Sequence, residues 1–146
     1  MVFVIRSYQS FLRRTQDEKT NFETLRIYRL SEVLADKIWN IVLNWNWFAK
    51  NTVGIQIVKA ADSVGANIAE GSGRGSNPEF KRFLKISRGS LYETRHWLRR
   101  AFARRLLTQQ QVEDLVPIIN ELTPKLNAYL RSIGTIKYKR SQAEVN

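Results

Sequence analysis

Apolar residues recur at intervals of three and four along most of the chain, a spacing that places them on one side of an α-helix. Four such segments are expected, over about residues 23–43, 52–70, 78–105 and 109–133. Short connections separate them, and no segment shows the alternating pattern typical of a β-strand. Because short connections favour antiparallel neighbours, the pattern predicts an all-α, antiparallel up-down four-helix bundle.

The bundle is expected to occupy residues 23–134 as one domain, with a segment of different character on either side. Residues 1–22 mix apolar and polar positions without a clear period, and we expect this N-terminal extension to pack on the bundle or on a neighbouring subunit. Residues 135–146 form a short basic C-terminal tail without a core pattern, which we expect to be mobile. Its cations are Lys137, Lys139 and Arg140.

The connection between the second and third helices has the clearest boundary signals in the chain. Three glycines follow one another within five residues, and we expect Gly71 to end the second helix with a positive φ angle. Asn77 is then expected as the N-cap of the third helix, with Pro78 at the first helical position and Glu79 in the first turn. The stretch from Lys59 to Thr94 therefore predicts a helix–corner–helix unit.

The fourth helix also carries boundary signals, together with two breaks in its pattern. Thr108 and Gln111 match a capping box, and Gly134 stands where a glycine commonly ends a helix. Pro117 and Pro124 lie inside the segment, and each removes a backbone donor. We expect each proline to kink or interrupt the helix.

Four aromatic residues exceed what one small bundle needs to bury, namely Phe3, Trp45, Trp47 and Trp97. Exposed aromatic surface of this kind favours association with other chains, so we expect an oligomer. Trp45 and Trp47 lie in the expected connection between the first two helices, where they either cap the core or stack on a nucleic-acid base. Capping of the core is the preferred interpretation.

The charge of the chain bears on its function. The chain has 24 Lys and Arg residues and 13 acidic residues, giving a net charge of +11. On the third helix, five cations fall within an arc of about 80° and along about 27 Å, on the side opposite the apolar residues. The arc contains no acidic residue to relieve the repulsion. These five residues, called the basic stripe below, are Lys81, Lys85, Arg88, Arg95 and Arg99.

The basic stripe suits a phosphate backbone, since cations spaced by helical turns hold charge and position without reading base identity. Arg82 flanks the stripe, and Tyr92 lies within it. Arg74, beside the N-terminus of the third helix, is a further candidate for a single phosphate; the alternative there is a plain helix corner. For the stripe itself, the alternative is a solvated surface without a ligand.

Catalytic and metal-binding chemistry finds little support in the sequence. The chain has no cysteine and a single histidine, His96, so neither a thiolate site nor a multi-histidine metal site is expected. No serine has a partnered base, and Glu70 and Glu79 at the corner are better explained as structural carboxylates. We therefore expect a non-enzymatic protein without cofactor or metal. With no apolar run near the ~20 residues of a membrane span and no signal peptide, a cytoplasmic protein is expected.

The string ANIAEGSGRGSNPEFKRFLKISRGSLYE, at residues 66–93, carries a family resemblance. It resembles the signature of the bacterial four-helix bundle proteins encoded in intervening sequences of large-subunit ribosomal RNA genes. That family is similar to the accessory variability determinant proteins that work beside diversity-generating reverse transcriptases. The resemblance covers about residues 24–134 and implies a four-helix bundle, assembly as a ring of five, and association with ribosomal RNA or with a reverse transcriptase and its template.

The residues and the resemblance together predict an oligomeric, nucleic-acid-binding accessory protein, with RNA preferred over DNA. The expected partners are a nucleic-acid backbone, a reverse transcriptase of a diversity-generating retroelement and further copies of the chain, but no membrane. Two alternatives stay open: a protein–protein interaction scaffold whose basic face docks an acidic partner, and a ribosomal-RNA-associated protein without a reverse transcriptase.

Overall fold

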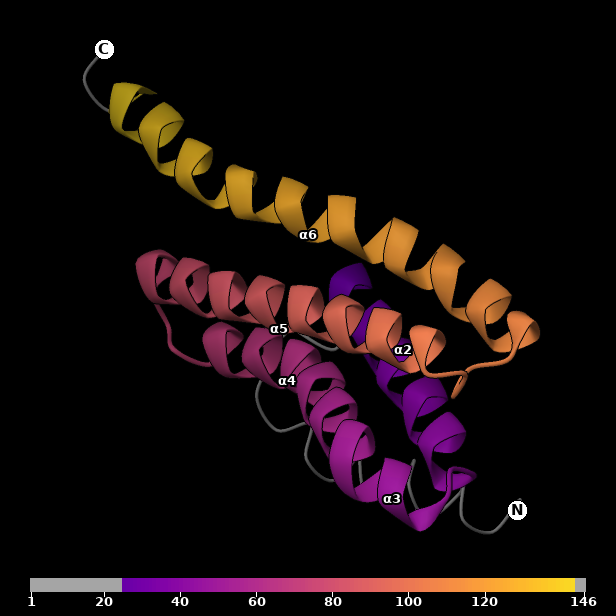
Figure 1. Ribbon diagram of the computed structural model, residues 1–146. Coiled ribbons are helices and arrows are strands. Elements are labelled where there is room, and N and C mark those ends of the chain that lie inside the picture. The colour runs from indigo at the N-terminus through magenta and orange to yellow at the C-terminus, as the bar shows by residue number, and fades with distance from the viewer. Residues whose placement is uncertain (1–24, 144–146) are drawn as a thin grey trace, which may run out of the picture.

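The computed structural model describes the backbone of residues 25–143 and the side chains of residues 25–133. Over this part of the chain the secondary structure is entirely helical (Figure 1). The elements in order are α2 (Arg26–Leu43), α3 (Trp47–Ala49), the π-helical segment η2 (Lys50–Gly54), α4 (Ile55–Ser72), α5 (Asn77–Ala103) and α6 (Gln109–Ala143). The predicted N-terminal extension, residues 1–22, lies outside the described residues.

The four long helices form a closed square of neighbours. α4 packs against both α2 and α5, and α6 also packs against α2 and α5, whereas the backbones of the diagonal pairs, α2 with α5 and α4 with α6, do not approach each other. Consecutive helices alternate in direction, as Figure 1 shows for α5 and α6. The predicted antiparallel four-helix bundle is confirmed.

Each long helix contributes one apolar stripe to a shared core, as the three- and four-residue spacing predicts. The core is lined by Leu34 and Ile38 of α2, Ile57, Val64 and Ile68 of α4, Leu84 and Leu91 of α5, and Leu122 and Leu126 of α6. Two polar residues on the apolar side of α5, Ser87 and Thr94, are also fully buried. Their hydroxyls are satisfied, because Ser87 Oγ donates to the carbonyl oxygen of Val64 at 2.8 Å and Thr94 Oγ1 donates to that of Ser90 at 2.8 Å.

One residue of α5 has the spacing of a core residue but is not in the core. Phe102 follows the buried Leu98 by four residues, yet its side chain is 55% exposed. It lies at the last turn of α5, where the facing wall of α6 leaves an open groove instead of closing over the ring. Helical periodicity identifies the face correctly but does not show where the partner helix ends its contact.

The corner between α4 and α5 differs from the prediction in which glycine ends the helix. Gly71 is buried inside α4, the C-cap is Gly73 with an ordinary φ of −79°, and the glycine with positive φ is Gly75, at 76°. Gly71 instead permits close approach, since a Cβ built there would lie 2.6 Å from Cβ of Phe83 on α5. The predicted C-cap role of Gly71 is therefore wrong.

The start of α5 is shifted by one residue from the prediction. Ser76, in extended conformation, is the N-cap, so that Asn77 is already helical and Pro78 follows it in the first turn. Glu79 lies in the first turn as expected, and its carboxylate accepts a hydrogen bond from Ser76 Oγ at 3.3 Å. An acid at this position complements the partial positive charge of the helix N-terminus.

The connection between α2 and α4 is shorter than predicted. Residues from Trp47 onward are already helical, first in α3 and then in η2, so the expected loop is confined to residues 44–46. Asn46 caps this helical run, because its side-chain oxygen accepts a hydrogen bond from the backbone N–H of Ala49 at 2.9 Å. The sequence signal for this earlier helix start is Asn46, an N-capping residue directly before an apolar segment, and the prediction did not include it.

The two tryptophans of that connection have different surroundings. Trp45 packs against the core, and its indole Nε1 donates to the carbonyl oxygen of Leu106 at 2.9 Å, which ties the α2 end to the α5–α6 connection. Trp47, in contrast, is 77% exposed. The capping interpretation is thus confirmed for Trp45 and wrong for Trp47.

α6 begins as predicted and ends later. The capping box is present, with the backbone N–H of Thr108 donating to Gln111 Oε1 at 2.9 Å and that of Gln111 donating to Thr108 Oγ1 at 3.1 Å. Neither Pro117 nor Pro124 interrupts the helix. Both prolines lie on its exposed side, where carbonyls tilt outward and hydrogen bonds lengthen most readily.

The predicted helix end at Gly134 is also wrong, because α6 continues to Ala143. Part of the predicted basic tail therefore belongs to this helix. The side chains of Lys137, Lys139 and Arg140 lie outside the described residues.

Candidate nucleic-acid interface

The basic stripe lies along the boundary between α5 and α6, since its residues line two cavities together with residues of α6. At its N-terminal end, the stripe residues Lys81, Lys85 and Arg88 line a shallow cavity of about 340 Å³ together with Asn127, Leu130 and Arg131 of α6. α6 partly covers this end, since Lys81 and Arg88 are only half-exposed. Arg88 Nη1 also donates a hydrogen bond to Asn127 Oδ1 at 3.2 Å.

The C-terminal half of the stripe is more open and richer in arginine. Arg95 and Arg99 are exposed, and Arg100, which the sequence places beside the stripe, joins them. These three residues, called the arginine cluster below, line a notch of about 370 Å³ with Tyr92 and His96. Within the part of the chain that the structure describes, no carboxylate forms an ion pair with the cluster. The cluster is therefore a concentration of unneutralised positive charge on α5.

An aromatic ring stands beside these charges. The guanidinium carbon of Arg95 lies 5.7 Å from the ring centroid of Tyr92, whose side chain is 46% exposed. This is a cation–π arrangement, which orients the guanidinium group. On the same turn, His96 meets Trp97 edge to face, with ring centroids 5.1 Å apart. The exposed end of the stripe thus combines cations with flat aromatic surfaces.

The two remaining sequence candidates lie near the corner, at the other end of α5. Arg82 and Arg74 both hold their guanidinium groups near the ring of Phe83, at 4.5 Å and 5.0 Å from its centroid. Arg74 also forms an ion pair with Glu70. That carboxylate offsets the Arg74 charge, so this residue contributes less to anion binding than the arginine cluster does. The structure does not bring Arg74 and the cluster together.

Acidic residues collect on the opposite side of the bundle, between α2 and α4. Glu32, Asp36 and Asp62 line a cleft there with the small residues of both helices. Burial, and secondarily the negative charge of Asp36, raises the pKa of Asp62 above its usual range. The α2–α4 boundary lies across the square from the α5–α6 boundary, so this acidic cleft is on the other side of the bundle from the basic stripe.

One ion pair closes the square between α2 and α6. Arg26 donates from Nε and Nη2 to the two carboxylate oxygens of Glu121 at 2.9 Å and 3.0 Å. The hydrogen bonds from Arg26 lower the pKa of Glu121. This exposed pair links α6 to α2, and α6 in turn forms one side of the basic boundary with α5.

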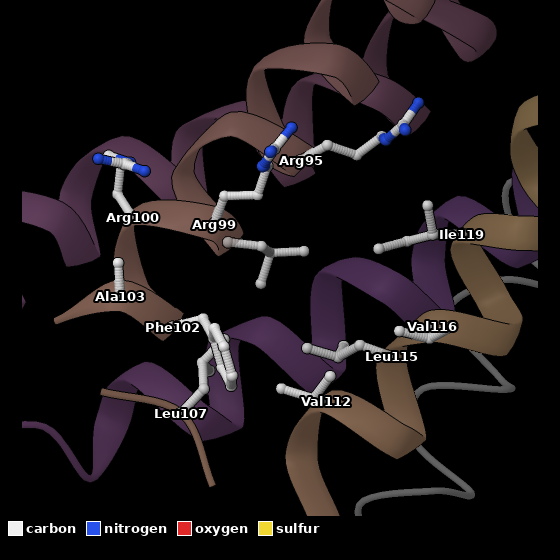
Figure 2. A pocket seen from close by; sticks show the side chains of 11 residues that line it. Arg95, Arg99, Arg100, Phe102, Ala103, Leu107, Val112, Leu115, Val116 and Ile119 are labelled. Carbon is white, nitrogen blue, oxygen red and sulfur yellow. The ribbon is translucent and has the colours of Figure 1, made fainter. Parts of the chain in front are cut away.

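An apolar groove of about 500 Å³ lies between the last turns of α5 and the first turns of α6, as Figure 2 shows. Its lining, with the arginine cluster along one rim, consists of Leu98, Phe102, Ala103, Leu107, Val112, Leu115, Val116 and Ile119. The sequence did not indicate this groove, because the spacing of Phe102 and Val116 is that of core residues. Only the separation of α5 from α6 at this level exposes them.

The described residues hold no group of three or more His, Asp or Glu side chains that could bind a metal ion. Among the same residues, every helix is too short or too polar to cross a membrane.

Comparison with known proteins identifies relatives by sequence and by fold. A family model described as 23S rRNA-intervening sequence protein matches residues 23–128. Among solved structures, a protein of unknown function from the S23 ribosomal protein family of Bacteroides thetaiotaomicron VPI-5482 is similar, with a TM-score of 0.63 and 25% identity. The similarity covers 71% of this chain and 97% of the other. No curated protein matches the chain.

Proposed function

The chain belongs to the family of 23S rRNA-intervening sequence proteins, and from that membership we propose that it is a non-enzymatic RNA-binding protein that contacts the phosphate backbone through the basic stripe and Arg100. The observation that carries this proposal is the arginine cluster, three exposed guanidinium groups without a carboxylate partner among the described residues. Like charges held together on one helix face repel one another, and an anionic polymer relieves that repulsion while releasing its own counterions.

The recognition mode follows from the kind of residue present. Arginine and lysine side chains spaced along a helix meet successive phosphates, and such contacts fix position without selecting sequence. RNA is the proposed polymer because the family is named for a ribosomal RNA. We place this activity in the cytoplasm.

Assembly would strengthen such binding. The resemblance of residues 66–93 supports a ring of five subunits, which would repeat the basic stripe around one axis and increase the overall affinity through multivalency. Sedimentation of the purified protein tests this part of the proposal. A species near five times 17.0 kDa is expected; a monomer at micromolar concentration would remove the ring.

A protein partner is the second candidate, and exposed apolar surface at one end of the bundle favours it. Trp39 and Leu43 of α2 are about half exposed, and Trp47 and Phe48 of α3 are 77% and 71% exposed. The resemblance to accessory variability determinant proteins makes a reverse transcriptase the proposed partner for this surface. In the scaffold alternative, an acidic protein docks on the basic face of α5 instead. Co-purification with a reverse transcriptase, lost on Trp47→Ala, would support the first.

RNA binding is tested by removing the basic stripe while leaving the core intact. The variant carries Gln at Lys81, Lys85, Arg88, Arg95 and Arg99, and its affinity for RNA of several sequences is measured by fluorescence anisotropy. Affinity should fall for all sequences alike. A control with Gln at the exposed residues Lys37, Lys59 and Lys125, on α2, α4 and α6, should bind almost as the parent does. If the stripe variant binds RNA as tightly as the parent, the basic stripe is a solvated surface that does not contact RNA.

A further inference from the structure

The apolar groove and the arginine cluster share residues, which makes them two parts of one surface. Arg95, Arg99 and Arg100 line both the groove and the polar notch beside it. Figure 2 shows their guanidinium groups along one rim and the apolar side chains of α5 and α6 below them. An anion held by the cluster therefore lies directly next to an apolar surface.

The groove contains accessible apolar side chains. Phe102 on α5 is 55% exposed and Val116 on α6 is 44% exposed, and they line opposite walls. A concave apolar site bordered by a few charged groups is the usual form of a ligand site in a protein. The ligand must therefore carry negative charge and an apolar body within the span of a few side chains.

The chemistry of the groove limits what this ligand is, because three guanidinium groups border its apolar walls. A nucleobase is small and flat, and its own phosphate lies beside it. The charge on the rim complements that phosphate, and the apolar walls complement the face of the base.

We propose that the groove receives an unpaired base of the bound RNA while the arginine cluster holds the adjoining phosphates. This rests on the proposed RNA binding and specifies its substrate as single-stranded rather than duplex RNA. In a duplex the bases are stacked and paired and cannot enter a side groove, whereas unpaired bases are commonly recognised by stacking on aromatic side chains. Phe102 is the ring available for that contact.

The test compares three RNA probes of equal length by fluorescence anisotropy at one fixed salt concentration. The first is single-stranded, the second is the same strand annealed to its complement, and the third is a single strand with abasic positions at its centre. The parent should bind the first probe more tightly than the other two. Phe102→Ala should weaken binding to the first probe by ~5- to 150-fold, the range expected for one base–aromatic stack, and leave the duplex affinity unchanged.

Two further variants show whether a loss of affinity comes from the groove or from removing any exposed apolar side chain. Val116→Gln, on the facing wall of the groove, should act in the same direction as Phe102→Ala. Val33→Gln replaces a similarly exposed valine on α2, away from the groove, and should leave binding to all three probes unchanged. Both groove residues are exposed, so these variants are expected to fold.

The outcomes distinguish this inference from the proposed function. If the parent binds RNA but Phe102→Ala changes nothing, or weakens duplex and single strand alike, the groove does not hold a base and only this inference fails. If the parent binds no RNA at all, both proposals fail. If the groove variants weaken capture of a protein partner and not of RNA, the groove is a protein-docking site and the inference is overturned.

Discussion

Gly71 provides a sensitive test of how α4 and α5 pack. The residue is buried inside α4, and a Cβ at this position would lie 2.6 Å from Cβ of Phe83 and 2.9 Å from Cδ2 of Phe80. Cβ of Phe83 is attached directly to the α5 backbone, so it cannot rotate away. Gly71→Ala therefore forces the two helices apart, and we expect it to destabilise the fold.

The size of the effect follows from two opposing terms. Overpacking a well-filled core by one methyl group lowers the free energy of unfolding by about 1–3 kcal/mol. Replacing glycine by alanine within a helix raises it by up to ~1 kcal/mol. Gly71 lies one residue before the end of α4, where the propensity term is small. The net destabilisation should be about 1–2 kcal/mol, which lowers Tm by about 3–8 °C in a domain of this size.

Thermal unfolding followed by circular dichroism measures this shift, with Gly89→Ala as the matched control. Gly89 lies in the exposed middle of α5, with nothing within 4 Å of an added Cβ, so the same substitution should raise Tm by a few degrees. Gly71→Val should lower Tm further than Gly71→Ala. A Tm for Gly71→Ala equal to or above that of the parent would refute the close approach of the two helices at this residue.

Three further predictions concern single interactions. Asp62→Asn should raise the free energy of unfolding at pH 7, because the raised pKa of Asp62 means that its charged form disfavours the fold; the gain should vanish as pH falls below 3.8, the unperturbed value. Glu121→Gln should lower stability above pH 4.5, and the difference from the parent should disappear as pH falls through the lowered pKa of Glu121; urea unfolding across pH measures both. Trp45→Phe removes the hydrogen bond to Leu106 and should cost about 1 kcal/mol, seen as a lower urea midpoint.

The sequence predicts the helices well because their periodicity reflects burial directly. Leu84, Leu91 and Leu98 repeat at seven-residue intervals and all are buried, and Thr108 with Gln111 forms the expected capping box. These features depend on short-range spacing, which a single chain segment contains completely.

Features that depend on the distance between helices could not be predicted from the spacing of residues along the chain. A glycine required for close approach, Gly71, and one required for positive φ, Gly75, are the same letter in the sequence, and only the position of Phe83 distinguishes them. Phe102 has the spacing of a core residue but faces a groove, because α6 stands away from α5 at that level. Likewise, the coverage of Arg88 by Asn127 depends on α6.

The salt dependence of RNA affinity tests the central claim most directly, because it counts the phosphates that the protein engages. For a single-stranded probe, log Kd changes with log salt concentration by about 0.7 per phosphate contact. Replacing Arg95, Arg99 and Arg100 with Gln should reduce that slope by about 2, whereas Gln at Lys37, Lys59 and Lys125, with the same loss of net charge, should leave it unchanged. Equal slopes for the parent and the arginine-cluster variant would contradict a phosphate-binding role for this face of α5.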